Sequence, residues 1–179
     1  MPYAYLALLR GINVGGKNKL PMKELAEMFV QAGCKDVRTF IQSGNVIFEA
    51  PVSVKVADVI TAKIEKRFGY RIPVIVRTSA QLLKTIRENP FLKAGALEKA
   101  LYVCFLSDAP KASAIATLDP ARSAPDAFQV RGQEIYLHLP NGVADSKLTN
   151  AYFDSKLSTI CTARNWATVL KLAAMMAEG

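Results

Sequence analysis

The sequence predicts an α+β protein that contains two similar units, each built on an antiparallel sheet. The elements expected over the first half follow the order β-α-β-β-α-β, and most of that order recurs in the second half. The 179 residues are 51% hydrophobic and 21% charged, a composition that suits one compact domain or two small ones.

In the first half, strands are expected at residues 3–9, 36–42, 45–50 and 72–77. Pro21 begins the first helix and Gly33 ends it, because proline suits the first turn and glycine the residue after the last one. Ser53 is expected to cap the second helix, which ends at Gly69. A third helix follows the last strand and stops before Pro90.

In the second half, a strand is expected at 101–106, a short helix at 110–118, a hairpin at 127–131 and 134–139, and helices at 146–160 and 165–177. This half therefore lacks a fourth strand. The order matches two tandem ferredoxin-like (split β-α-β) units with an added C-terminal helix. We place the boundary at 90/91, so that units 1–90 and 91–179 form one compact rigid body.

Net charge and cysteine use limit the class of protein. The formal net charge is +8, which admits phosphorylated metabolites or nucleic acid as partners. Three widely spaced cysteines make neither a disulfide framework nor a metal cluster, and no apolar run is long enough to span a membrane. We expect a cytoplasmic protein without a metal site, and the sequence specifies neither a cofactor nor the oligomeric state.

The segment 10–20 between the first strand and the first helix is the most distinctive one. Residues 11–17 fit the pattern G-x-x-x-x-G-K of a phosphate-binding loop. Asn18, however, stands where Ser or Thr would hold magnesium, and Pro21 places the helix several residues after Lys17. An antiparallel sheet also differs from the parallel sheet of nucleotide hydrolases. A true P-loop hydrolase is therefore disfavoured.

The looser expectation is an anion site, most readily for phosphate. Glycines expose backbone N–H groups, lysines add positive charge, and the segment has no carboxylate. The ferredoxin-like topology brings the turn at 43–45 to the same edge, and Arg164 and Asn165 would complete the site if the halves pack edge to edge. The expected ligand-binding residues are Arg10, Asn13, Gly15, Gly16, Lys17, Asn18, Ser43, Asn45, Arg164 and Asn165.

A structural interpretation competes with this one. The asparagines and Arg10 can cap backbone groups of a tight path, and Ser43, Gly44 and Asn45 suit a hairpin turn. Arg164 is expected at the start of the last helix, where the helix dipole disfavours a cation. Its partner would be Asp145, Asp154 or an incoming anion.

Three sequence blocks resemble a known family. They are ALLRGINVGGKNKLPM at 7–22, IQSGNVIF at 41–48 and TARNWATVLKL at 162–172, with the dipeptide KL at 147–148. On these blocks the chain is identified as a member of the bacterial family catalogued as domain of unknown function 1697. The resemblance implies a duplicated ferredoxin-like fold, and it implies no activity, cofactor or catalytic residue.

Other functions stay open. Weak RNA binding is the second hypothesis, with Tyr3, Tyr5, Phe48 or Tyr136 as stacking candidates on the sheets. A protein-interaction module without a ligand is the third. His138 is in phase with Tyr136 and is expected on the more exposed face of its sheet. Nothing resembles a Ser-His-Asp set, so whether the protein is an enzyme is undecided.

Overall fold

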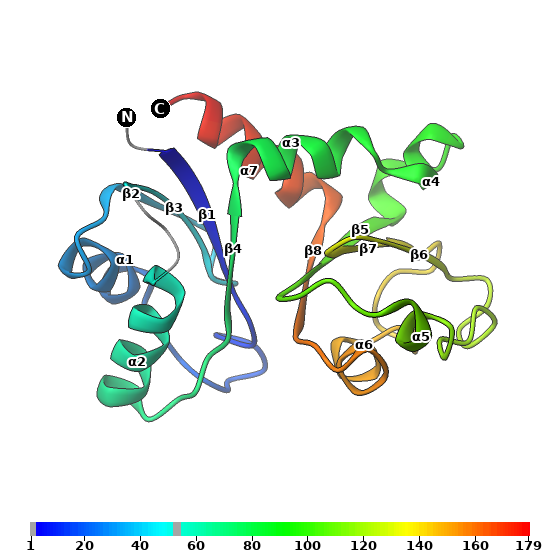
Figure 1. The fold of residues 1–179 in the computed structure, drawn as a ribbon, viewed down its shortest axis with the longest axis horizontal. Coiled ribbons are helices and arrows are strands. Elements are labelled where there is room, and N and C mark those ends of the chain that lie inside the picture. The colour runs from blue at the N-terminus through cyan, green and yellow to red at the C-terminus, as the bar shows by residue number, and fades with distance from the viewer. Residues whose placement is uncertain (1–2, 52–54) are drawn as a thin grey trace. The chain divides into compact units, whose positions relative to one another are not determined.

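A computed structural model describes residues 3–51 and 55–179. It contains two four-stranded antiparallel sheets with helices, which confirms the α+β class (Figure 1). The first compact unit comprises the chain up to Leu83 together with Leu172–Gly179, and the second comprises Lys84–Lys171. The expected helix cap Ser53 lies outside the described residues.

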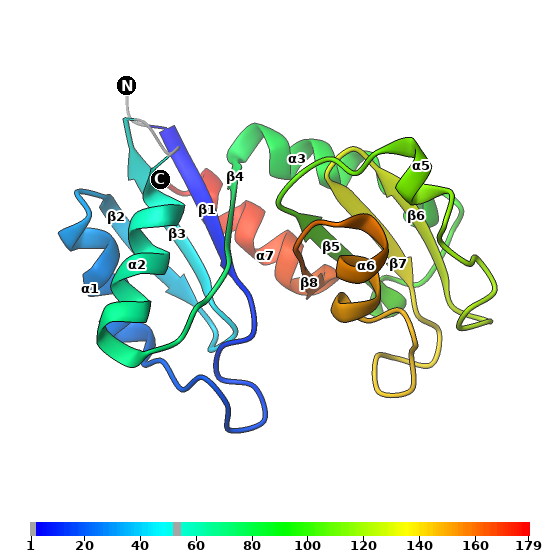
Figure 2. The ribbon, with the colours of Figure 1, turned by 60° about the horizontal axis from the view of Figure 1, so that its bottom comes forward.

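The first sheet has the strand order β2-β3-β1-β4, so β1 is a central strand. Its strands are β1 (Tyr3–Leu9), β2 (Lys35–Phe40), β3 (Asn45–Ala50) and β4 (Val74–Thr78). The helices α1 (Met22–Gln31) and α2 (Val56–Phe68) cover one face of this sheet in both ribbon views (Figures 1 and 2). Leu9, Phe29, Phe48 and Ile64 are buried in the core between them.

The connection between β2 and β3 is longer than the tight Ser43-Gly44 turn that the sequence suggested. It occupies residues 41–44, and β2 ends at Phe40. Ile41 has a φ of 51°, a conformation that β-branched residues rarely adopt. The sequence could not indicate this turn, because Ile41 and Gln42 continue the apolar-polar alternation of the strand.

The first half ends in short helices. In α3 (Ser79–Arg87), Thr78 and Gln81 form a reciprocal capping box: Thr78 N–H donates to Gln81 Oε1 at 2.8 Å, and Gln81 N–H to Thr78 Oγ1 at 3.1 Å. Asn89 then caps α4 (Pro90–Lys93) by accepting from two backbone N–H groups. The 3₁₀ helix η1 (Glu98–Ala100) leads directly into the second sheet.

The second sheet repeats the pattern of the first, with the order β6-β7-β5-β8. Its strands are β5 (Leu101–Leu106), β6 (Ala127–Arg131), β7 (Glu134–His138) and β8 (Cys161–Asn165). The helices in this half are α5 (Ala112–Ile115), α6 (Asn150–Leu157) and α7 (Trp166–Ala177). Leu106, Leu137 and Phe153 belong to its core.

Strand β8 corrects the expectation that the second half lacks a fourth strand. It pairs antiparallel with β5, for example Cys104 with Ala163. The five residues CTARN have no aromatic or β-branched run, and Thr162 to Asn165 resemble the capping sequence of a helix. Pairing with β5 and burial of Cys161 determine the strand, and neither can be read from local sequence.

The face of the second sheet that carries Tyr136 is covered, contrary to expectation. Tyr136 is 1% exposed, and its hydroxyl donates to the carbonyl of Thr85 at 2.8 Å. His138 stacks on Phe91 of α4 with 5.7 Å between ring centroids. The segment that follows β4 therefore provides this cover, which the alternation within β7 alone could not reveal.

Among the described residues, no helix has the length and apolar character needed to cross a membrane.

Gly44 allows a close approach of the chain to the end of β1. A Cβ atom there would lie 2.8 Å from Leu9 Cβ, and its φ is 89°. Gly33 has the same φ of 89° but no atom within 4 Å of the added Cβ position. We expect Gly33→Ala to lower the free energy of unfolding by about 1–2 kcal/mol. Gly44→Ala should cost about 1–3 kcal/mol more, because it adds a clash to the same backbone strain.

Denaturant unfolding of both variants measures the difference. Equal losses of stability would show that Leu9 and Gly44 do not approach as described.

Candidate functional site

The segment between β1 and α1 forms a small hairpin that projects beyond the strand ends (Figure 2). Lys17 N–H donates to the carbonyl of Val14 at 3.0 Å, and Asn13 N–H to that of Asn18 at 3.2 Å. Gly15 and Gly16 have φ values of 57° and 74°. Two consecutive positive φ angles are typical of a type I′ turn, which glycine adopts without steric cost.

The side chain of Asn13 fixes the base of this hairpin. Its Nδ2 donates to the carbonyl of Leu20 at 2.9 Å and to that of Gln42 at 2.8 Å. Its Oδ1 accepts from Leu20 N–H at 2.8 Å. The amide thus joins the hairpin both to the start of α1 and to the turn between β2 and β3.

Asn18 closes the hairpin from the other side. Its Nδ2 donates to the carbonyl of Gly11 at 2.9 Å. Both asparagines have positive φ, 54° for Asn13 and 48° for Asn18, a conformation that asparagine tolerates better than most residues. Their amides are therefore engaged in the fold, as the structural interpretation expects.

Three segments converge at this edge of the first unit. Leu9 N–H donates to the carbonyl of Gly44 at 2.8 Å, and Arg10 N–H to that of Pro73 at 3.1 Å. The turn 41–44 and the residue before β4 thus meet the end of β1. Asn45 is fully buried, and its Nδ2 donates to the carbonyl of Phe40 and to Ser43 Oγ.

The exposed part of the edge is basic. Gly15, Gly16, Lys17 and Lys19 are exposed, and Arg10 is half-buried. Within the described residues, neither Gly15 N–H nor Gly16 N–H donates to a protein atom. The segments 10–20 and 41–45 contain no aspartate or glutamate. These segments therefore offer hydrogen-bond donors and positive charge, and they contribute no carboxylate of their own.

The geometry differs from that of a nucleotide-hydrolase loop. Lys17 belongs to the turn of a hairpin, and α1 begins only at Met22. In a phosphate-cradling loop the lysine lies at the start of the helix, on a parallel sheet. The sequence match at 11–17 thus does not correspond to that structure.

Arg164 and Asn165 belong to the second unit. Arg164 lies in β8 and not at a helix start, and its Nη1 donates to Thr162 Oγ1 and to the carbonyl of Ala163, each at 2.8 Å. Burial lowers the pKa of its guanidinium to about 10, so the group stays charged at neutral pH. Asn165 Oδ1 accepts from Thr168 N–H and caps α7. Their participation in an anion site stays a prediction.

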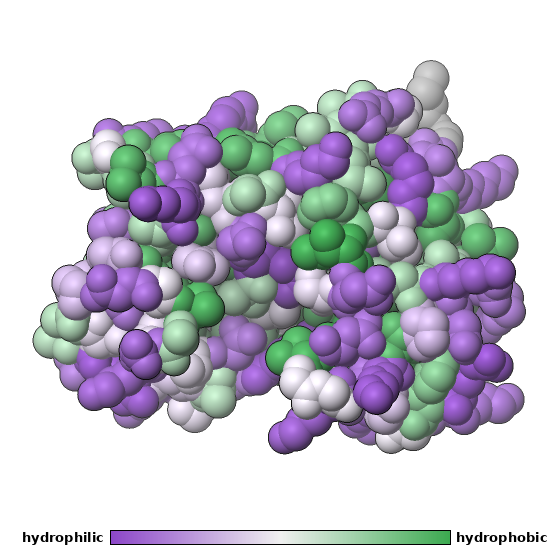
Figure 3. Space-filling model, turned by 180° about the vertical axis from the view of Figure 1, so that it is seen from behind, coloured by the Kyte–Doolittle hydropathy of each residue, from purple (hydrophilic) through white to green (hydrophobic). Residues whose placement is uncertain are grey.

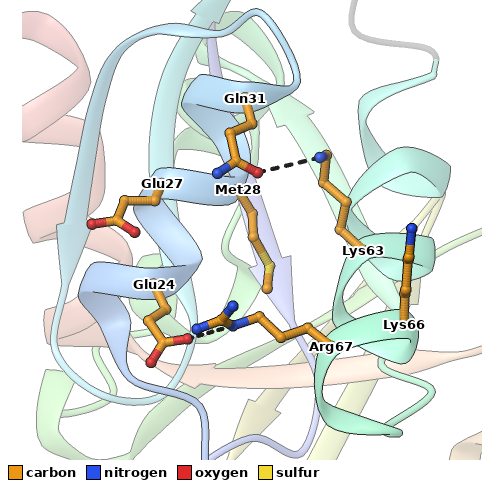
Figure 4. A pocket seen from close by; sticks show the side chains of 7 residues that line it. All are labelled: Glu24, Glu27, Met28, Gln31, Lys63, Lys66 and Arg67. Atoms are coloured by element: carbon orange, nitrogen blue, oxygen red, sulfur yellow. Dashed lines mark hydrogen bonds and ion pairs between the residues drawn. The ribbon is translucent and has the colours of Figure 1, made fainter.

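Two hollows are present that the sequence did not indicate. The first, of about 370 Å³, lies between α1 and α2 (Figure 4). Arg67 Nε pairs with Glu24 Oε2 at 2.7 Å, and Lys63 Nζ donates to Gln31 Oε1 at 3.4 Å. One ion pair and one hydrogen bond between the facing helices therefore span this hollow, and its lining carries both signs of charge.

The second hollow, of about 480 Å³, lies in the second unit between residues 108–117 and 157–159. Ser107 Oγ lies 2.9 Å from Thr159 Oγ1 and donates to Asp108 Oδ2 at 3.1 Å. Asp108 and Lys111 both line the hollow, so it lacks the uniform charge of the basic edge.

A family model described as "Protein of unknown function (DUF1697)" matches residues 3–136. The chain belongs to this family. No curated protein matches the chain. Among solved structures, it is similar to the conserved bacterial protein SP0830 from Streptococcus pneumoniae, with 20% identity and a TM-score of 0.70. The match covers 98% of this chain and 99% of that one. At this identity the similarity shows the fold alone.

We predict that Asn13 contributes more to stability than Asn18 does. Glycine at either position keeps the positive φ and removes only the side-chain hydrogen bonds. Asn13→Gly loses three such bonds and should lower the free energy of unfolding by about 2–3 kcal/mol, whereas Asn18→Gly loses one and should cost about 1 kcal/mol.

Thermal and denaturant unfolding of the two glycine variants provide the comparison. If both variants lose the same stability, Asn13 does not join the three segments as described.

Proposed function

We propose that the first unit binds an anionic, phosphate-bearing ligand at the hairpin formed by residues 13–18. One observation carries this proposal: the N–H groups of Gly15 and Gly16 are exposed beside Lys17 and Lys19, in a segment without a carboxylate. Adjacent backbone donors and ammonium groups are the means by which proteins bind phosphate. Each charge-assisted contact of this kind contributes about 1.5–3 kcal/mol.

The residues of the predicted site take different parts in this proposal. Gly15, Gly16, Lys17 and Lys19 supply the contacts, and Arg10 adds charge at the hairpin base. Asn13 and Asn18 position the hairpin through the hydrogen bonds described above, and Asn45 holds the neighbouring turn together with Ser43. In this proposal the segment has two functions, anion binding and the joining of neighbouring segments of the fold.

Binding is proposed here, and not catalysis. The segments 10–20 and 41–45 contain no histidine, cysteine or carboxylate that could exchange a proton near neutral pH. Lysine, arginine and backbone donors suit the positioning of phosphate.

RNA binding through sheet aromatics is not favoured. The rings of Tyr5 and Phe48 stack within the core of the first unit, with 5.6 Å between their centroids, and Tyr136 is buried in the second unit. These rings are therefore not available to stack on bases. Tyr3 is exposed, but a single ring is a poor platform for successive bases.

We further propose that each unit is ferredoxin-like and that the two form one rigid body in the cytoplasm. Both units have the same strand order, β2-β3-β1-β4 and β6-β7-β5-β8, with a helix after the first and the third strand in the chain. This arrangement supports the ferredoxin-like fold.

The rigid body is supported by α3 and α7, because each of these helices begins in one unit and ends in the other. Three free, buried cysteines suit a reducing compartment. Limited proteolysis that releases a stable fragment of residues 1–90 would contradict the rigid body.

The anion site predicts a specific loss of binding. In an NMR titration with inorganic phosphate or tripolyphosphate, the Gly15 and Gly16 amide signals should shift. Lys17→Ala with Lys19→Ala should weaken tripolyphosphate binding by about a hundredfold or more, because two charge-assisted contacts of about 1.5–3 kcal/mol each are lost. The free energy of unfolding should change by less than about 0.5 kcal/mol, since both side chains are exposed.

The matched control removes the same charge elsewhere. Lys66→Ala with Lys99→Ala, both at exposed positions, should leave the Gly15 and Gly16 shifts and the affinity unchanged. If both pairs weaken binding equally, only net charge matters and the site does not exist. If the double variant of Lys17 and Lys19 unfolds the protein, the segment serves only to hold the fold together.

A further inference from the structure

We propose that the hairpin 13–18 and the turn 41–44, together called the loop edge, form a docking surface for an acidic protein segment that also carries aliphatic side chains. This inference rests on the anion site proposed above and names the molecule to which the anionic groups belong. A carboxylate-rich segment offers the loop edge the same oxygen acceptors as phosphate does, at several points along one chain.

The openness of the loop edge favours a macromolecular partner. A site for a small molecule buries most of its ligand in a concave pocket. The hairpin instead projects from the unit (Figure 2), and residues 14–17 are all exposed. The two hollows described above lie elsewhere, on α1 and α2 and at residues 108–117. A partner that lies across the loop edge can bury surface that a free anion cannot.

The loop edge also exposes two aliphatic side chains. Val14 is 62% exposed and Ile41 is 50% exposed. Single exposed apolar residues are ordinary, and Figure 3 shows others scattered among hydrophilic residues on the face that it draws. Val14 and Ile41 differ from these because a hydrogen bond joins the residues next to them: Asn13 Nδ2 donates to the carbonyl of Gln42 at 2.8 Å. The hairpin and the turn that carry the two aliphatic side chains are therefore directly connected.

Ile41 is held in a conformation that its side chain disfavours. Its φ of 51° suits glycine or asparagine and is unusual for a β-branched residue. The turn is held by the bonds from Asn13 to Gln42 and from Leu9 to Gly44. Half of the Ile41 surface stays exposed, so the residue gains only part of the possible apolar burial within the chain in return for this disfavoured backbone. A contact outside the chain gives the isoleucine a role.

Charge and surface chemistry identify the class of partner. Lys17 belongs to the loop edge and Lys19 follows the hairpin directly, while the loop edge contains no aspartate or glutamate. Its charge is therefore complementary to that of an acidic chain. Nucleic acid would also satisfy the charge, but the loop edge has no aromatic ring for a base to stack on. Aliphatic side chains between cations suit a protein segment that combines acidic and apolar residues.

The test compares three probes of equal charge with the full-length protein. Two are twelve-residue peptides with six glutamates: the first also contains leucines and serines, and the second only serines. The third is a single-stranded RNA of seven nucleotides. At physiological salt we expect the leucine peptide to bind about fivefold or more tightly than the serine peptide, since apolar burial adds to charge.

The variant Val14→Ser with Ile41→Asn should abolish that difference and leave tripolyphosphate binding intact. Asparagine accepts a positive φ, so the variant should fold at least as stably as the unmodified protein. Val30→Ser is the matched control, because Val30 is 59% exposed on α1, and it should preserve the difference.

The outcomes separate this inference from the anion site. Tripolyphosphate binding with equal affinity for the two peptides, or with affinity for neither, overturns the docking surface and leaves the anion site standing. Tighter binding of the RNA overturns it in favour of nucleic acid. Failure to bind tripolyphosphate and all three probes overturns both proposals.

Discussion

The end of strand β1 is the constraint on which the candidate site depends. β1 pairs with β3 on one side and β4 on the other, so its last residues must meet the connections of both neighbours. Leu9 and Arg10 do so through backbone hydrogen bonds to Gly44 and Pro73. Gly44 is required because a side chain there would collide with Leu9. The hairpin 13–18 begins directly after this junction, so its position follows from the pairing of the sheet.

The sequence predicted most elements because their patterns are local. The strand β3, the apolar stripe of α1 and the αL glycine after α2 could each be predicted from a few neighbouring residues, and all are present. β8 was missed because its stability comes from pairing with β5, more than fifty residues away in the chain. The cover over Tyr136 was missed for a similar reason, since Thr85 and Phe91 reach it from α3 and α4. Patterns within a single strand carry no information on what packs above it.

The segment of the candidate site was chosen from the sequence, but which of its residues hold the fold together could not be predicted. Glycines, lysines and asparagines between a strand and a helix marked the segment. Whether an asparagine amide contacts a ligand or a carbonyl depends on where carbonyls 20 and 42 lie, which the fold alone determines. The exposure of Val14 and Ile41 was not predicted either, and Ile41 was expected in the strand 36–42. Their exposure is the observation that the sequence could not provide.

The second unit shows that the fold does not require a long segment at this position. Leu106 N–H donates to the carbonyl of Gln133 at 2.8 Å, and Ser107 N–H to that of Ile160 at 2.9 Å. These bonds repeat the junction that Leu9 and Arg10 make in the first unit. There the chain reaches α5 through residues 107–111, whereas the first unit uses residues 10–21 to reach α1. Ordering the extra residues costs conformational entropy, and five positions in 10–21 have positive φ. Because the short connection of the second unit closes the same junction, closure of the fold does not explain the hairpin. The proposed anion site would give its exposed donors and cations a role.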